Sequence, residues 1–270
     1  MRKSLVVVPN GGLCNRLRVV LSAYLAAQQY GWSIRVEWGR DRNCWAHFDD
    51  LFEPLTAEHF SITHRSFWNN YISRKNLRLP GLLRVFLYDR QQSQYCPQQH
   101  GDLPTFVQPC RKVYLSTGYA LMDYPENMNR LLRPLPRLQE RIDRIRQQFP
   151  AEIVGVHIRR TDHVVAMRNS TLEAFYAALD EEIAQHPSVC FYLATDDEQL
   201  KAEMQVKYGR RILVQSTQCC RNTLEGIEEA VVDLWLLAST RKILGSYYSS
   251  YSVTAAEIGE IPLCVVKSAD

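Results

Sequence analysis

The second half of the chain alternates between short apolar runs and longer segments with helical spacing, and this alternation restricts the fold more than any other feature. The expected strands are 153–158, 189–194, 211–215, 242–244 and 262–266, and the expected helices are 171–185, 197–207, 224–239 and 252–258. Strands that alternate with helices of about 10–15 residues predict parallel βαβ units. The class is therefore α/β, with a doubly wound sheet that binds ligands at the carboxyl ends of its strands.

The first half begins in the same way and then loses its periodicity. A strand is expected at 5–9, a helix from Asn15 that ends at Gly31, and a strand at 34–38. From residue 41 to 136 the pattern is weak, which favours loops or short irregular helices. Regular helical spacing returns after Pro136, so we expect two Rossmann-like domains, at 1–135 and 136–270, divided at the proline-containing segment 133–136.

Composition excludes several classes of protein. The 270 residues carry a net charge of +3 and are 46% hydrophobic, which is typical of a globular protein and does not predict nucleic-acid binding by bulk charge. No run approaches the ~20 apolar residues of a membrane span, and the first apolar run is short for a signal peptide. We therefore expect a cytoplasmic protein, at most peripheral at the inner face of the membrane. The 8 cysteines lack C-x-x-C spacing and H-E-x-x-H is absent, so we expect buried thiols and no metal site.

Two adjacent arginines follow one of the expected buried strands. Arg159 and Arg160 end the strand and are followed by a threonine and Asp162. A guanidinium group offers a planar fork of donors that suits phosphate oxygens, so the pair could clamp a diphosphate, with Asp162 orienting one of them. Strand alternation puts His157 on the same face as Arg159. A surface ion-pair cluster above a satisfied core histidine explains these residues equally well.

A glycine-containing turn joins the first strand to the first helix. The segment Asn10–Arg16 reads N-G-G-L-C-N-R. Glycines let the backbone approach a ligand closely, and the N-terminus of a helix favours an anion. The turn is neither G-x-G-x-x-G nor a P-loop, so an ordinary structural turn is the default interpretation.

Acidic residues and serines occupy three further positions beside expected strands or helices. Asp196 and Asp197 end a strand, where a carboxylate could accept hydrogen bonds from sugar hydroxyls, although one of them could instead cap the next helix. Asp233 lies in the apolar run 231–237, so its carboxylate needs a donor from the protein or from the edge of a ligand base. Serines at 249, 250 and 252 precede a helix, where they could bind an anion or simply cap it.

The order of these motifs resembles that of the α1,6-fucosyltransferase superfamily, which includes the N-glycan core and rhizobial nodulation-factor enzymes. H-I-R-R-T-D is followed by A-T-D-D, then by a V-x-D helix, then by the serine cluster before A-x-E-I, and the resemblance runs from residue 11 to 258. The α1,2- and protein O-fucosyltransferases are more distantly similar. The resemblance implies a GT-B arrangement with the donor site in the C-terminal domain, GDP-fucose as donor, inversion at the anomeric carbon and no metal cofactor.

The resemblance also implies roles for individual residues. Arg159 and Arg160 would hold the diphosphate, and Asp196 would lie near the donor ribose or sugar. His157 and Asp233 would contact guanine. The β-phosphate would be approached by the first turn and by the serine cluster, namely Gly11, Gly12, Cys14, Asn15, Ser249, Ser250 and Ser252.

Two positions depart from the family pattern. Cys14 stands where the family usually has glycine, although its backbone N–H remains. The lysine and glutamate that activate the acceptor in core-fucosylating enzymes are replaced by the segment His163–Met167. The nearest glutamate, Glu173, is explained by a capping box with Ser170. The catalytic base is therefore His163, Asp196, a group in the N-terminal domain, or none if the transition state is sufficiently dissociative.

These observations favour an inverting, metal-independent glycosyltransferase. We expect it to transfer fucose from GDP-fucose to a hydroxyl of a soluble or carrier-linked glycan. A transferase that uses GDP-mannose or another nucleotide sugar has the same fold requirements. A nucleotide-sugar-binding protein without catalysis is the third alternative, because no base is evident.

Overall fold

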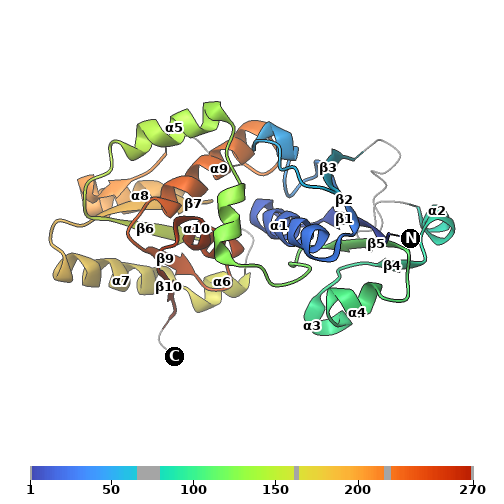
Figure 1. Cartoon of the computed structure of the whole chain (residues 1–270). Helices are drawn as coiled ribbons and strands as arrows, with labels where there is room; N and C mark the ends of the chain where they lie inside the picture. The colour runs from blue at the N-terminus through green and yellow to red at the C-terminus, as the bar shows by residue number, and fades with distance from the viewer. Residues whose placement is uncertain (1, 66–79, 161–163, 216–219, 269–270) are drawn as a thin grey trace. The chain divides into compact units, whose positions relative to one another are not determined.

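The structure is a computed structural model that describes residues 2–65, 80–160, 164–215 and 220–268. The chain divides into two compact units, each with its own parallel sheet (Figure 1). The N-terminal unit contains Met1–Arg133 together with Arg221–Leu224, and the C-terminal unit contains the remainder. The backbone N–H of Trp45 donates to the carbonyl of Arg221 at 2.9 Å, which ties the short second segment to the first unit.

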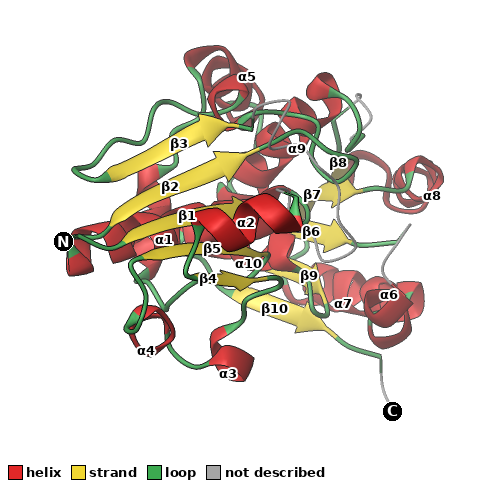
Figure 2. Ribbon diagram, turned by 90° about the vertical axis from the view of Figure 1, so that its right-hand side faces the viewer, coloured by secondary structure: helices red, strands yellow, loops and turns green. Residues whose placement is uncertain are grey.

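The N-terminal unit is built on five parallel strands in the order β3-β2-β1-β5-β4. The strands are β1 (Ser4–Pro9), β2 (Ser33–Trp38), β3 (Phe60–His64), β4 (Arg90–Gln92) and β5 (Lys112–Thr117). The helices are α1 (Leu13–Tyr30), α2 (Gly81–Leu87), α3 (Pro97–His100) and α4 (Leu103–Val107), with the 3₁₀ segments η1 (Phe48–Asp50) and η3 (Glu126–Leu131). Figure 2 shows β1, β2 and β3 running in one direction.

Helix α1 forms where the periodicity predicted a helix, and it covers one face of this sheet. Leu17, Val20 and Leu21 are fully buried on it, as are Leu5 and Val7 on β1. The helix ends at Gly31, whose φ of 63° is the left-handed conformation that glycine adopts without steric cost.

The C-terminal unit is a second five-stranded parallel sheet, in the order β10-β9-β6-β7-β8. Its strands are β6 (Ile153–Ile158), β7 (Cys190–Thr195), β8 (Ile212–Leu213), β9 (Ile243–Ser246) and β10 (Leu263–Val266). Its helices are α5 (Pro136–Arg146), α6 (Val164–Asn169), α7 (Leu172–Gln185), α8 (Glu198–Tyr208), α9 (Leu224–Ala238) and α10 (Ser250–Gly259), with η4 (Gly209–Arg211) before β8. This confirms the alternating pattern of the sequence.

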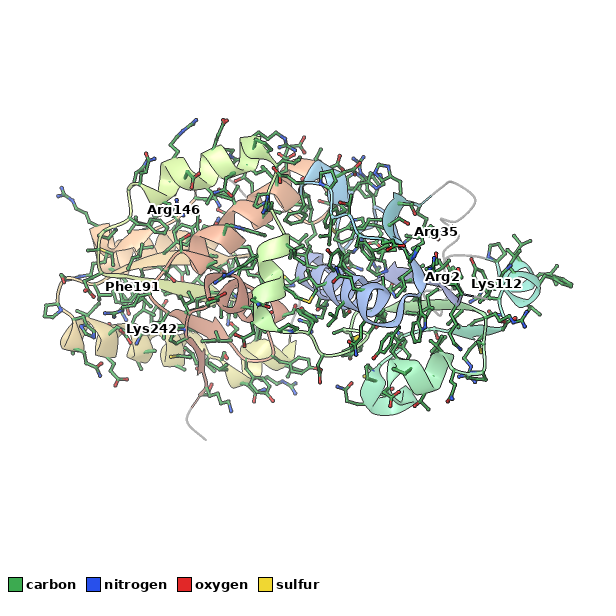
Figure 3. The ribbon with its side chains drawn as sticks, in the orientation of Figure 1. Arg2, Arg35, Lys112, Arg146, Phe191 and Lys242 are labelled. Atoms are coloured by element: carbon green, nitrogen blue, oxygen red, sulfur yellow. The ribbon has the colours of Figure 1, made fainter. Side chains whose placement is uncertain are left out.

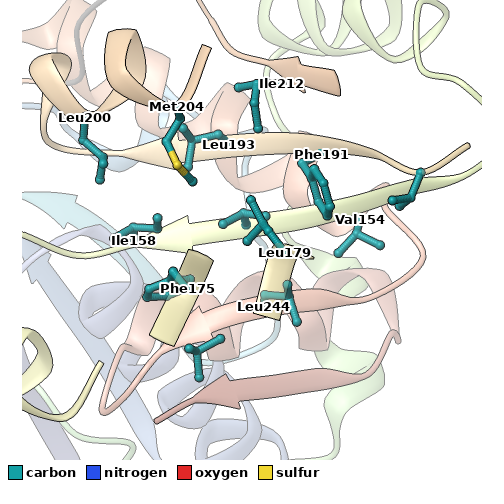
Figure 4. Close-up of a cluster of buried hydrophobic side chains, with 13 residues drawn as sticks. Val154, Ile158, Phe175, Leu179, Phe191, Leu193, Leu200, Met204, Ile212 and Leu244 are labelled. Carbon is teal, nitrogen blue, oxygen red and sulfur yellow. The ribbon is translucent and has the colours of Figure 1, made fainter. Parts of the chain in front are cut away.

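A continuous apolar core lies between this sheet and helices α7 and α8 (Figure 4). Val154 and Phe191 project from the strands toward Phe175 of α7 and Met204 of α8, and all four are fully buried. Helix α9 packs beside Gly155 and helix α10 beside Gly245, on the face opposite Val154 and Leu244, so both faces of the sheet are covered. At the amino end of β9 an ion pair joins Lys242 to Glu182 of α7, and Figure 3 labels Lys242 next to that helix.

The structure corrects three predictions. The segment 41–136 was expected to hold only loops and short helices, but it contributes β3, β4 and β5. The predicted capping box is wrong, because Thr171 caps α7 by accepting from the Ala174 N–H at 3.3 Å. Ser170 instead accepts from the Tyr247 N–H at 2.8 Å. The cysteines are not all core residues, since Cys264 is exposed.

Candidate functional site

Each sheet reverses its strand order at one point, and the candidate residues of each unit follow strands next to that point. In the C-terminal unit, β6 leads outward to β7 and β8, whereas β9 returns to the other side of β6. The neighbouring strands at this reversal are β6 and β9. Open α/β sheets bind ligands at the carboxyl ends of such neighbours. Arg159 follows β6 directly, and the serine cluster follows β9.

Asp196 organises the two arginines. Its carboxylate accepts the backbone N–H of Arg160 at 2.9 Å through Oδ1 and pairs with the Arg159 guanidinium at 3.2 Å through Oδ2. Arg159 is further fixed because its N–H donates to Ser246 Oγ at 2.9 Å. Among the described residues, no carboxylate pairs with the guanidinium of Arg160. Asp196 is therefore the carboxylate that orients the arginines, a role that the sequence analysis gave to Asp162.

His157 lies on β6, two residues before Arg159, and its ring is held by residues of α10. Its Nδ1 is 2.8 Å from Ser252 Oγ and 3.4 Å from Ser249 Oγ, and its ring packs 4.8 Å from that of Tyr251. Burial, together with the charge of Arg159, lowers the pKa of His157 to about 3. The imidazole is therefore neutral at neutral pH and exchanges hydrogen bonds with serines.

The N-terminus of α10 is built from the serines that the sequence singled out. Ser249 is the N-cap residue and accepts the Ser252 N–H at 3.4 Å. The helix packs closely on β9 because Gly245 has no side chain: a Cβ there would lie 2.7 Å from Ser252 Cβ. Capping is thus confirmed for Ser249, and the unpaired N–H groups of the first turn give this helix end a partial positive charge.

Asp233 and Asp197 have partners inside the protein. Asp233 Oδ1 accepts the hydroxyl of Tyr192 and the side-chain amide of Gln215, the latter at 2.5 Å, within a buried environment. These protein donors are sufficient to explain the burial of its carboxylate. Asp197 caps α8 by accepting the Leu200 N–H at 3.1 Å.

The first turn of the N-terminal unit occupies the other reversal, between β1 and β5. Gly11 has a φ of 82° and thus requires glycine, whereas Gly12 is the extended N-cap residue of α1. Cys14 is buried in the first turn of that helix. Asn15 lies over Gly11, because a Cβ on Gly11 would be 2.8 Å from Asn15 Nδ2.

Sequence reasoning missed Arg16, which holds this turn in place. Its fully buried side chain donates to the Gly11 carbonyl at 2.9 Å and to the Gly39 carbonyl at 2.5 Å, and pairs with Asp41 at 2.7 Å. The signal was present in the sequence, because Arg16 shares the apolar face of α1 with Leu13 and Val20 at helical spacing. A charge in that position predicts a buried partner.

Two candidate site residues, Asp162 and His163, lie outside the described residues. Within the described ranges, no group of three or more His, Cys, Asp or Glu residues is arranged to hold a metal ion. In the same ranges, no helix has the length and apolar character needed to cross a membrane.

Comparison with known proteins extends the description of the fold. Neither models of protein families nor curated protein sequences match this sequence. Solved structures do match. The α-1,6-fucosyltransferase NodZ soaked with GDP-fucose shares 17% identity over 96% of this chain and 93% of its own, with a TM-score of 0.65. POFUT1 in complex with GDP shares 12% identity over 98% of both chains, with a TM-score of 0.63.

A further structure of fucosyltransferase NodZ, from Bradyrhizobium, covers 94% of this chain and 92% of its own at 17% identity and a TM-score of 0.63. The alignments span both units of the chain. At the level of the fold they confirm the resemblance that the order of motifs indicated. The chain has the GT-B fold of the fucosyltransferases NodZ and POFUT1.

Proposed function

We propose that this protein is an inverting glycosyltransferase that transfers a sugar, most simply fucose, from a GDP-sugar to a glycan hydroxyl. The observation that carries the proposal is the pair of arginines at the carboxyl end of β6. Asp196 accepts the backbone N–H of Arg160 and pairs with the guanidinium of Arg159. Both residues are therefore held at the strand reversal, beside the N-terminus of α10. The fold, shared with enzymes crystallised with GDP-fucose and GDP, supports the same chemistry.

The reaction needs stabilisation of a leaving diphosphate. When the bond between the anomeric carbon and the phosphate oxygen breaks, negative charge develops on the β-phosphate. Donors that are already oriented stabilise such charge without reorganisation during the reaction. The arginines and the first-turn N–H groups of α10 would provide these donors. Within its own unit, the turn from Gly11 to Asn15 offers a second helix N-terminus that suits an anion.

Asp233 bears on the identity of the nucleotide base in the donor. Asp233, which the resemblance assigned to guanine, already accepts hydrogen bonds from Tyr192 and Gln215. This observation favours keeping a second candidate, a transferase for a different nucleotide sugar. A panel of nucleotide-sugar donors distinguishes the two candidates.

A donor panel tests the proposal. GDP-fucose, GDP-mannose and UDP-glucose are each incubated with the protein and with methyl glycosides of galactose and N-acetylglucosamine, and nucleoside diphosphate release is measured. We expect release from one GDP-sugar. Arg160→Ala should reduce it, while Arg146→Ala, an exposed arginine on α5 paired with Asp143, should not. Tight binding without release would indicate a binding protein, and release from UDP-glucose alone would contradict a GDP-sugar donor.

A further inference from the structure

Helix α2 is oriented the opposite way from an ordinary surface helix, which packs its apolar stripe inward and exposes its charges. Its single charged residue, Arg84, is 9% exposed, whereas its apolar side chains lie at the surface. The exposed fractions are 73% for Leu82, 49% for Leu83, 66% for Val85, 79% for Phe86 and 50% for Leu87. The outer surface of α2 therefore suits surroundings that are less polar than water.

These five apolar side chains, called the α2 patch below, are contiguous. Among the described side chains, no other helix exposes more than one large apolar residue; Val206 on α8 and Val253 on α10 are examples. Single exposed apolar residues are common on proteins, but contiguous ones mark a surface that contacts a protein or a membrane. The α2 patch is therefore a candidate interaction surface.

The sheet of the N-terminal unit holds α2 in this orientation. The backbone N–H of Tyr88, the residue after the helix, donates to the Arg84 carbonyl at 3.0 Å. The Tyr88 ring packs against the buried cluster formed by Val6, Val8 and Tyr114, with 5.1 Å between the two tyrosine ring centroids. Burial lowers the pKa of Arg84 and the nearby Tyr114 opposes this effect, so the guanidinium lies on the side of the sheet. The α2 patch is thus presented outward by a folded segment.

Basic residues flank the end of the helix. Asp89 accepts the backbone N–H groups of Arg111 and Lys112 at 2.7 and 2.8 Å, and the side chains of both basic residues are exposed. Figure 3 labels Lys112 beside α2. The sequence has the same bias, because residues 59–88 contain no aspartate or glutamate. An apolar helix flanked by basic side chains is the combination that binds the surface of an anionic membrane.

The size of α2 distinguishes a membrane surface from other occupants. Seven residues extend about 10 Å, whereas crossing a bilayer requires about 30 Å, so the helix can lie in the interface but cannot span it. The outer face of such a helix, roughly 10 Å on a side, is much smaller than the area of about 800 Å² that each partner buries in a stable protein–protein interface. A lipid surface needs no complementary shape, and an apolar helix face enters it to a depth of about 5–10 Å.

We propose that α2 is an interfacial anchor, whose apolar side chains enter the headgroup region of an anionic membrane while Arg111 and Lys112 contact lipid phosphates. The sequence predicted a protein at most peripheral to a membrane, and the α2 patch supplies the surface for such binding. The anchor would keep the protein beside acceptors carried on lipids; this consequence alone rests on the proposed transferase function.

Flotation with lipid vesicles tests the anchor. The full chain is mixed with vesicles of phosphatidylcholine, with or without phosphatidylglycerol, and we expect binding to those that contain phosphatidylglycerol. Joint replacement Leu82→Gln and Phe86→Gln should lower the partition coefficient by about tenfold or more, because two large side chains no longer leave water. Glutamine keeps a high helix propensity, so the free energy of unfolding in urea should not change. Val206→Gln, at a solitary exposed valine, is the matched control and should bind as the wild type does.

Two further measurements test the charges and the location. Arg111→Gln and Lys112→Gln should each weaken binding to phosphatidylglycerol vesicles by about fivefold, the usual contribution of one basic residue near an anionic surface. Amide hydrogen exchange should slow in residues 81–88 when these vesicles are added, and should stay unchanged in α8.

The proposal is overturned if the wild-type protein does not bind phosphatidylglycerol vesicles, or if the Leu82→Gln, Phe86→Gln protein binds them equally well. A dimer in solution that the same double substitution dissociates would also overturn it, because a second copy would then cover the helix. Vesicle binding does not depend on turnover, and GDP release is measured without vesicles. Failure of the anchor and failure of the transferase function are therefore distinguished.

Discussion

Arg159 and Arg160 are neighbours in the sequence, yet the structure holds them in different ways. The guanidinium of Arg159 pairs with Asp196, whereas Arg160 is fixed through its backbone N–H and keeps its guanidinium away from described carboxylates. Removing Arg159 therefore deprives Asp196 of an ion-pair partner. Replacing Arg160 by alanine keeps the backbone N–H that Asp196 accepts.

This difference predicts separate effects of the two alanine variants. A charge-assisted contact to phosphate contributes about 1.5–3 kcal/mol, so each variant should lose roughly 10- to 150-fold in kcat/KM. Only Arg159→Ala should also lower the free energy of unfolding. Urea denaturation and steady-state kinetics on both variants check this, with Arg160→Lys retaining part of the activity. Unchanged kinetics for Arg160→Ala would remove that residue from the phosphate site.

The buried His157 predicts how stability depends on pH. Its folded pKa of about 3 lies below the ordinary value of about 6.5, so between these limits the unfolded chain binds a proton that the folded protein does not. The stabilisation is complete above pH 6.5 and is lost as pH falls toward 3. At pH 5 this one group should remove about 2 kcal/mol.

Urea unfolding at pH 7 and pH 5 measures the effect. His157→Gln, which keeps a polar side chain beside Ser252, should lose correspondingly less stability over this interval than the wild-type protein. Equal losses in the two proteins would show that His157 is not the titrating group.

Among elements, the packing of α10 on β9 decides where the serine-rich helix end lies. Gly245 permits this contact, since a Cβ there would come within 2.7 Å of Ser252 Cβ and 2.8 Å of Leu263 Cδ1. Gly155 on β6 provides a comparable close contact, where a Cβ would lie 2.8 Å from Thr240 Oγ1. The contact at Gly155 involves the end of α9 rather than α10.

The two glycines therefore form a matched pair. Overpacking of this kind costs about 1–3 kcal/mol, so Gly245→Ala and Gly155→Ala should both lower the free energy of unfolding. Only Gly245→Ala should weaken binding of GDP in calorimetry, because it displaces the N-terminus of α10. Equal GDP affinities for the two variants would contradict the role of that helix end in phosphate binding.

For the whole molecule, the proposed transfer would draw the positive charge that it needs at the diphosphate from the protein's own groups. The arginines after β6 and the N-terminus of α10 belong to one unit and to two strands that adjoin at its reversal point. Such fixed positive groups stabilise a leaving phosphate in the manner of a metal ion. We therefore propose that the reaction is metal-independent.

Turnover of the preferred donor in excess EDTA tests that expectation. Activity should match that of untreated protein. Loss of activity that Mg²⁺ or Mn²⁺ specifically restores would show that the arginines and the helix end are insufficient.

The sequence by itself determined the elements with strong local patterns. β6 and the helices α7–α9 lie within a few residues of their predicted bounds. A buried strand is visible in the sequence as a short continuous apolar run, and an amphipathic helix as apolar residues that recur with helical spacing. It also identified Arg159 and Arg160 as the charges at a strand end. β5 was missed because Lys112–Thr117 lies within a weakly patterned region.

Only the tertiary structure decided which partner each polar residue takes. Asp196 follows an apolar strand and Asp233 lies in an apolar helix, yet one orients the arginines and the other is bound by Tyr192 and Gln215. His64 and Asp49 are 15 residues apart and meet because β3 ends beside η1. Periodicity is a local property that a single segment expresses, whereas a hydrogen bond between distant residues depends on how separate elements pack. The sequence therefore determined the alternating elements of the C-terminal unit and the first β-α-β segment of the N-terminal unit, and the packing of the folded chain determined which polar groups meet.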